Sequence, residues 1–220
     1  MSTVPRVWEP YWSRVGGLAQ PAKMPAYAYG ISADQCAVGG MLARVPGSIC
    51  GKCYAKKGHY RYRSVETTHR RRFKAMRGPG WARDMSELLR LVYAGVRTSK
   101  RFFRWFDSGD IPDEGSACHI FAVAVENPWI RFWLPTRELA LVRSAIDRAG
   151  SVPENLTIRV PAPMIDQQVR RKNPLVSSSV HQNRKAFGYE CRAYRRSEAN
   201  CGPCRACWNR DVANVSYPLH

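Results

Sequence analysis

The sequence predicts a single α/β domain that is TIM-barrel-like, either a full thin (β/α) barrel or a partial one. Short apolar segments alternate with segments of helical period, an order typical of a parallel sheet with helical crossovers. The 220 residues, 45% of them hydrophobic, suffice for one core of that kind. We expect one domain over residues 1–220, with an N-terminal arm over 1–25 and a cysteine-rich C-terminal segment over 186–220.

The expected elements follow one another along the chain. The arm is rich in proline and aromatic residues and has no clear period. The expected strands are 26–32, 102–106, 129–134, 156–160 and 175–180. The expected helices are 64–76 with Ser64 as its cap, 81–97, 114–126, and one that is capped by Thr136 and stops at Gly150.

A long glycine-rich loop, residues 33–58, separates the first expected strand from the first helix and contains Cys36, Cys50 and Cys53. Loops of this length in a compact domain are usually functional. The carboxyl ends of parallel strands meet at one edge of a sheet, which is where α/β folds place their chemistry. We expect this loop, the turn after the second strand, Thr136, Arg137, the Pro161 loop and His181 to share that edge, with the C-terminal cysteines within reach.

The turn after the second strand, Asp107-Ser108-Gly109-Asp110, supplies two candidate cofactor-binding residues, Asp107 and Asp110. Acidic side chains at the end of a buried strand suit ligand binding at that edge. The alternative interpretation is that either aspartate only caps the following helix. No Ser/His/Asp order, Walker loop or H-E-x-x-H motif is present, which argues against a conventional hydrolase, nucleotidase or zincin.

Eight cysteines indicate a metal site, because the N-terminal residues lack the apolar run of a signal peptide and thiols inside cells stay reduced. Cys201-Gly-Pro-Cys204-Arg-Ala-Cys207 has the C-x2-C-x2-C spacing of loops that hold a 4Fe–4S cluster. The fourth ligand is expected to be Cys191. In the alternative set, the last of these cysteines and the pair Cys50 and Cys53 supply the ligands. Cys36 is a further candidate ligand, and Cys118 is interpreted as a buried apolar residue.

A zinc site is the alternative for the cysteines. Cys50 and Cys53 would then pair with Cys204 and Cys207 to form a four-thiolate site that stabilises a nucleic-acid-binding protein. The net charge of +18, from 35 basic and 17 acidic residues, favours an anionic partner such as nucleic acid. The basic and aromatic stretch 56–77, with His59 and His69, is the candidate contact surface, unless it is only a solvated helix face.

Several motifs together resemble the gene product 88 domain proteins of bacteriophages. They are Cys36, Cys50-Gly-Lys-Cys53-Tyr-Ala-Lys56, the arginine-rich helix after it, Asp107-Ser-Gly-Asp110, Phe132-Trp-Leu-Pro-Thr-Arg137, and Cys191 with Cys201-Gly-Pro-Cys204-Arg-Ala-Cys207-Trp208 and a final His220. The resemblance implies a phage-encoded protein that acts in the host cytoplasm, and it makes both cysteine groups family features. It implies no activity.

The chain is also somewhat similar to the partial barrels of radical S-adenosylmethionine enzymes, which carry a cluster loop after the first strand and a glycine-containing turn after the second. It departs from their C-x3-C-x2-C loop, because thirteen residues separate Cys36 from Cys50.

The predicted function is therefore that of a 4Fe–4S protein with a redox, electron-transfer or structural role. The alternatives are the zinc-stabilised nucleic-acid-binding protein and a radical enzyme, so catalysis is left open. The expected partners are nucleic acid or a host redox protein. A membrane is not expected, since no apolar run approaches the length that spans a bilayer. The sequence does not predict an oligomeric state.

Overall fold

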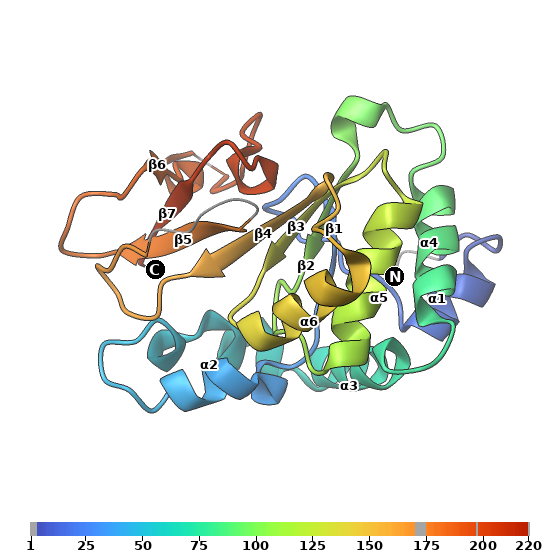
Figure 1. The fold of residues 1–220 in the computed structure, drawn as a ribbon, viewed down its shortest axis with the longest axis horizontal. Helices are drawn as coiled ribbons and strands as arrows, with labels where there is room; N and C mark the ends of the chain where they lie inside the picture. The colour runs from blue at the N-terminus through green and yellow to red at the C-terminus, as the bar shows by residue number, and fades with distance from the viewer. Residues whose placement is uncertain (1–3, 170–174, 197, 220) are drawn as a thin grey trace.

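The centre of the fold is a parallel sheet (Figure 1). The computed structural model describes residues 4–169, 175–196 and 198–219. Seven strands lie in the order β1-β2-β3-β4-β5-β7-β6, and all neighbouring pairs are parallel. The strands are β1 (Tyr27–Tyr29), β2 (Phe102–Trp105), β3 (Arg131–Pro135), β4 (Leu156–Pro161), β5 (Leu175–His181), β6 (Tyr189–Glu190) and β7 (Asn214–Pro218). The predicted α/β class is confirmed.

The sheet is open. β1 and β6 are its edge strands, and in the described residues no pairing joins them. From β1 to β5 the spatial order follows the chain, as in a (β/α) barrel, and does not reverse as in a doubly wound sheet. The structure thus confirms a parallel sheet but not a closed barrel.

Helices cover one face of the sheet. They are α1 (Glu9–Val15), α3 (Arg63–Met76), α4 (Trp81–Val92), α5 (Glu114–Glu126) and α6 (Leu139–Ala149), while α2 (Ala37–Leu42) lies in the loop after β1 and contributes no residue to the core on this face. Successive strand side chains point to opposite faces, and Phe103 and Trp105 of β2 and Phe132 of β3 belong to the core on the helix side. That core also contains Leu88 of α4 and Ile120 of α5, so the helical apolar spacing that predicted α4 does face the sheet.

The C-terminal segment covers part of the other face (red in Figure 1). Phe102 and Trp133 point to this side and pack with Trp208 in a small second cluster. The ring centroids of Trp208 lie 5.3 Å from Phe102 and 5.4 Å from Trp133. Trp208 therefore packs the cysteine segment onto the sheet.

Several expectations need correction. The arm over residues 1–25 contains the helix α1, which packs on α4. Ser64 lies inside α3, which begins at Arg63. The C-terminal cysteines do not follow the last strand to the carboxyl edge; they precede β7 and lie against the face of the sheet. The sequence analysis missed β6, which has only two residues, and β7, which alternates polar and apolar residues over a short stretch. In the described part of the chain, no helix combines the length and apolarity needed to cross a membrane.

Candidate functional site

The loop after β1 gathers three cysteines that are spread over 18 residues of sequence. We call Cys36, Cys50 and Cys53 the edge thiols. A Cβ added to Gly39 would lie 3.6 Å from Sγ of Cys50 and 3.7 Å from Sγ of Cys36, so both sulfurs lie against this glycine. Burial, followed by the charge of Asp110, raises the pKa of the Cys36 thiol to about 12. The thiols of Cys53 and Cys50 add to this rise, which places all three edge thiols together.

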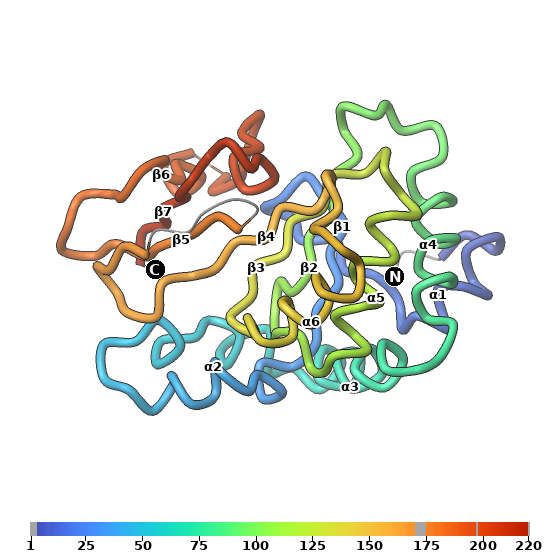
Figure 2. Tube along the Cα trace, viewed as in Figure 1, coloured from blue at the N-terminus to red at the C-terminus, as the bar shows by residue number. Residues whose placement is uncertain are grey.

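Arg137 connects the carboxyl ends of β3 and β4 and contacts this loop through Cys50. Its guanidinium donates to the carbonyl oxygens of Pro161 and Ala162, each at 3.0 Å. Burial raises the pKa of the Cys50 thiol, while the charge of Arg137 and a hydrogen bond from it oppose that shift. The Ile49 N–H donates to the Pro163 carbonyl at 3.0 Å and holds the loop on the same side. The loop that carries the edge thiols thus lies where the sequence predicted, at the carboxyl edge of the sheet, and its blue-to-cyan trace runs along the bottom of Figure 2.

Asp110 has a structural role at this edge. Its Oδ1 accepts hydrogen bonds from Thr136 Oγ1 at 2.6 Å and from the Ile111 N–H at 2.8 Å, and its Oδ2 accepts one from the Arg137 N–H at 2.9 Å. Burial raises the pKa of Asp110 to about 6, although these three bonds oppose the shift. The carboxylate therefore positions the backbone of Arg137. Asp113 caps α5, with Oδ1 accepting from the Ser116 N–H at 2.8 Å, so neither Asp107 nor Asp110 is the cap.

Asp107, by contrast, keeps an unused oxygen. Its side chain is buried, and within the described residues Oδ1 has no hydrogen-bond partner. Gly30 leaves room for that oxygen, because a Cβ there would collide with it. The Asp107 carbonyl accepts hydrogen bonds from Tyr54 Oη at 2.6 Å and from Tyr60 Oη at 3.4 Å. A buried oxygen without a partner is costly, which marks Asp107 as a ligand-binding candidate.

A pocket of about 610 Å³ lies beside Asp107 and Tyr60, under the N-terminal arm. Its walls come from the arm, from the stretch after the edge thiols and from α3, and they comprise Ala19, Gln20, Pro21, Ala22, His59, Tyr60, Ser64, Val65, Thr68, His69, Arg72 and Asp107. Burial raises the pKa of Tyr60, and the nearby Cys53 thiol adds to that rise. Because Tyr60 lines the pocket, the pocket adjoins the edge thiols. Pockets of this volume hold nucleoside-sized ligands.

His69 is buried in this wall, which corrects its assignment to an exposed basic face. Its ring stacks on Tyr60, with centroids 6.1 Å apart and planes at 26°. Burial first, and then the charge of Arg72, lower the pKa of His69. Arg72 is buried too, and its guanidinium donates to the carbonyl of Gly17 at 3.0 Å. Part of the basic stretch 56–77 is thus interior structure, while His59 is exposed as expected.

The other four cysteines form a second group, which we call the face thiols: Cys191, Cys201, Cys204 and Cys207. Burial raises the pKa of the Cys201 thiol, and Cys191 and Cys204 add to the rise. Burial raises the pKa of Cys207 to about 12, with smaller additions from Cys191 and Cys201. Each face thiol therefore lies near others of the group.

Arg159 of β4 holds the face thiols on the sheet. It is fully buried and donates to the carbonyls of Ala206, Cys207 and Asn209 at 2.8, 3.0 and 2.7 Å. It also donates to the carbonyls of Ser177 and Val212. One guanidinium thus fixes the path of the chain from residue 206 to 212.

Two tyrosines contact sulfurs of this group. Tyr189 Oη lies 3.2 Å from Sγ of Cys204, and Tyr217 Oη lies 3.1 Å from Sγ of Cys207. A hydroxyl can donate to a thiolate at such a distance. Arg205 and Arg104 lower the pKa of Cys201 against the effect of burial, so positive charge also faces this group. An anionic metal–thiolate centre would be stabilised by this set of donors and cations.

The two thiol groups are separate. Wherever the charge of one thiol raises the pKa of another, the two cysteines belong to the same group. In Figure 2 the segments that carry them lie on different sides of the sheet, the blue-to-cyan loop below it and the red segment above. In residues 4–169, 175–196 and 198–219, no three His, Cys, Asp or Glu side chains are grouped tightly enough to hold a metal ion. Cys118 is partly buried against the helix-side core, consistent with an apolar role.

The strand arginines were missed by the sequence analysis. Arg104 and Arg159 interrupt otherwise apolar strands, and that was the available signal. Arg210 donates to the carbonyls of Pro153 and Leu156. Lys56 pairs with Asp34 at 3.6 Å.

The cysteines of the two groups span residues 36 to 207. A family model described as gene product 88 matches residues 14–210, a span that includes both groups. The chain belongs to the gene product 88 family. Searches among curated proteins and among solved structures give no significant match. The resemblance seen in the motifs is therefore confirmed, except that its final residue, His220, lies outside the described residues. The family description names a gene product and no chemistry, so the function must be inferred from the two thiol groups.

Proposed function

We propose that this gene product 88 protein is an iron–sulfur protein with two 4Fe–4S clusters, one on the face thiols and one on the edge thiols. The observation that carries the proposal is the gathering of seven of the eight cysteines into two groups. A cuboidal cluster offers a separate iron to each thiolate, so its ligands stand farther apart than those of a single ion.

The face thiols supply the four ligands of a closed cluster. Tyr189 and Tyr217 are placed to donate hydrogen bonds to two of the sulfurs, and Arg159 and Arg205 offset negative charge. A cluster with four protein thiolates has no iron free for a substrate, so its chemistry is electron transfer or structural support. We infer that this cluster exchanges electrons with the edge site or with a redox protein of the host cytoplasm.

The edge thiols supply only three ligands. A 4Fe–4S cluster held there would leave one iron without a thiolate and open to a small molecule. This favours a second candidate function, that of an enzyme of the radical S-adenosylmethionine type, in which that molecule is S-adenosylmethionine. The loop between β1 and α3 and the open parallel sheet, understood as a partial barrel, support this candidate.

The pocket beside the edge thiols has the size and the chemistry for such a ligand. Its volume of about 610 Å³ suits a nucleoside, and the unpartnered Oδ1 of Asp107 suits an ammonium group. Tyr60 and His69 present aromatic surface in the same wall. Asp107 is therefore our candidate cofactor-binding residue, and Asp110 is a positioning residue.

The test is elemental analysis of protein purified without oxygen, combined with the absorption spectrum. Two clusters give about eight irons and eight sulfides per chain and a brown protein. One zinc per chain and a colourless solution would contradict the proposal and favour the zinc-stabilised nucleic-acid-binding protein.

The second candidate has its own test, electron paramagnetic resonance of the reduced protein with and without S-adenosylmethionine. Binding to an open iron changes the signal of the edge cluster, and Asp107→Asn weakens that change. Asp34→Asn, at an exposed aspartate that pairs with Lys56 and Arg61, serves as the control. An unchanged signal at saturating S-adenosylmethionine would eliminate the radical enzyme and leave the electron carrier.

A further inference from the structure

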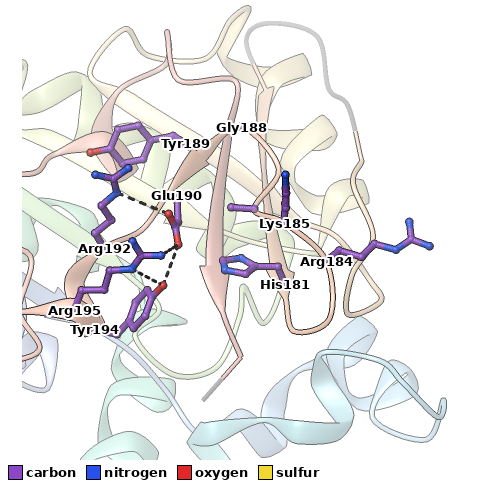
Figure 3. A pocket seen from close by; sticks show the side chains of 10 residues that line it. His181, Arg184, Lys185, Gly188, Tyr189, Glu190, Arg192, Tyr194 and Arg195 are labelled. Atoms are coloured by element: carbon purple, nitrogen blue, oxygen red, sulfur yellow. Dashed lines mark hydrogen bonds and ion pairs between the residues drawn. The ribbon is translucent and has the colours of Figure 1, made fainter.

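A groove of about 840 Å³ opens beside the face thiols, between the end of β5 and the stretch that contains β6 (Figure 3). None of its lining residues is a cysteine, and Tyr189 connects it to the face thiols. The groove is lined by His181, Arg184, Lys185, Ala186, Gly188, Tyr189, Glu190, Arg192, Tyr194 and Arg195. Its chemistry differs from that of the pocket under the arm, because basic and aromatic side chains dominate it.

Positive charge exceeds negative charge in this groove. Four of the lining residues are Arg or Lys, and Glu190 is the one acidic residue in that set. Glu190 is already shared: its carboxylate accepts from Arg195 at 2.9 Å, lies 3.7 Å from Arg192 and accepts from Tyr194 Oη at 2.9 Å. Figure 3 shows this network on one side of the groove, with His181 and Lys185 on the other.

The turn that carries Arg184 and Lys185 is preorganised by hydrogen bonds. Asp166 accepts backbone N–H bonds from residues 182, 183 and 184 at 2.7, 3.0 and 3.3 Å, which fix the turn after β5. Arg184 and Lys185 follow in this turn with exposed side chains, and neither forms an ion pair within the described residues. Even with Asp166 counted, the groove keeps an excess of positive charge.

Two tyrosine rings accompany the cations. Tyr189 is 45% exposed and Tyr194 is 43% exposed, among the larger exposures of any apolar or aromatic residue described. Exposed aromatic rings along a basic groove are what single-stranded nucleic acids use, because phosphates pair with the cations while unpaired bases stack on the rings. A duplex hides the faces of its bases, and an acidic peptide gains nothing comparable from the rings.

We propose that this groove binds single-stranded nucleic acid, with phosphates at Arg184, Lys185 and Arg192 and bases on Tyr189 and Tyr194. The overall charge of +18 adds long-range attraction for such a strand. Tyr189 also contacts Cys204, so a bound strand would lie directly beside the face thiols. This site is distinct from the basic helix α3 that the sequence suggested, and it does not depend on a cluster.

The test is fluorescence anisotropy of labelled single-stranded DNA and RNA and of a matched duplex, titrated with the full chain over a range of salt. The double variant Arg184→Glu/Lys185→Glu should lose about tenfold or more in affinity, and the slope of log K against log salt should shrink by about 1.4. The matched control is Arg63→Glu/Arg70→Glu on α3, two exposed arginines with the same total change of charge, which should change affinity much less.

The rings are tested separately. Tyr194→Ala should weaken single-strand binding about fivefold or more, while Tyr194→Phe, which keeps the ring, should bind like the wild type. Circular dichroism confirms that each variant is folded. The proposal is overturned if single strands do not bind at moderate salt, if the α3 pair matters as much as the groove pair, or if the duplex binds as tightly as the single strand.

Discussion

The edge thiols and the face thiols differ in how the fold holds them. The edge loop is held by a hydrogen bond from the half-buried Arg137 to Cys50 and by the bond from the Ile49 N–H to the Pro163 carbonyl, and it adjoins a pocket with an unpartnered oxygen on Asp107. The face segment is fixed by Arg159, which is fully buried and donates to five carbonyls. One region therefore has room and polar groups for a ligand, while the other is built to stay closed. Two clusters held in these different ways would have different functions.

The largest expected effect is on the face region. Arg159→Met removes the donor for five carbonyls and should cost about 3–5 kcal/mol of unfolding free energy. It should also release the segment 206–212, which limited proteolysis and near-ultraviolet circular dichroism of Trp208 would detect. Arg210→Met is the matched control, since Arg210 donates to only two carbonyls in the same region, and it should cost less. Equal costs would mean that Arg159 is not the principal anchor.

The corresponding change at the edge is Arg137→Met. It should cost less stability, about 1–3 kcal/mol, because Arg137 is half-buried and donates to two carbonyls. Its main effect should be on metal content, with loss of iron from the edge site and none from the face site. Urea unfolding and iron analysis on the same samples measure both. A variant that loses stability to the same extent as Arg159→Met would remove the contrast between the two supports.

Acid should act through the edge region, where His69 is buried. Because its pKa in the folded protein is lowered, the unfolded chain takes up a proton near pH 6.5 before the folded protein does. Stability is therefore complete above about pH 6.5 and falls below it, by at most about 1.4 kcal/mol per pH unit for this group. Melting temperatures between pH 7 and pH 5 should fall less steeply for His69→Gln than for the wild type. The exposed His59, changed to Gln, should leave the slope as it is.

The smallest expected effect is on the potential of the face cluster. Tyr217→Phe removes the hydroxyl that lies 3.1 Å from Cys207 Sγ, and loss of a hydrogen bond to sulfur lowers a cluster's reduction potential. Tyr54→Phe is the control, since that hydroxyl donates to the Asp107 carbonyl and not to sulfur. A redox titration that gives one value for both variants would show that Tyr217 does not tune the cluster.

Most strands and helices could be predicted from apolar periodicity, because β2 to β4 and α4 to α6 bury continuous or alternating apolar residues, whereas three buried serines interrupt the pattern in β5. The edge site was predicted as far as topology allows, since a parallel sheet brings the loop after β1 and the turn after β2 together. The grouping of Cys36 with Cys50 and Cys53 could not be predicted, because it depends on α2 and Gly39 folding the loop back.

The face site was placed wrongly for a similar reason. The cysteine spacing was visible, but its position depends on Arg159, and a single arginine inside a strand does not reveal which carbonyls it will bind. Likewise, only the structure distinguishes Asp110, whose oxygens are used, from Asp107, which keeps one free. Hydrogen bonds between distant parts of the chain carry information that local patterns lack.

The central claim is that two independent thiol groups each hold a cluster. The most direct measurement is iron per chain in Cys50→Ser and in Cys204→Ser, each purified without oxygen beside the wild type. We predict about eight irons in the wild type and about four in each variant, with different absorption and resonance spectra for the two remaining clusters. If one variant loses all its iron while the other keeps the wild-type amount, a single cluster exists and the two-site account is wrong.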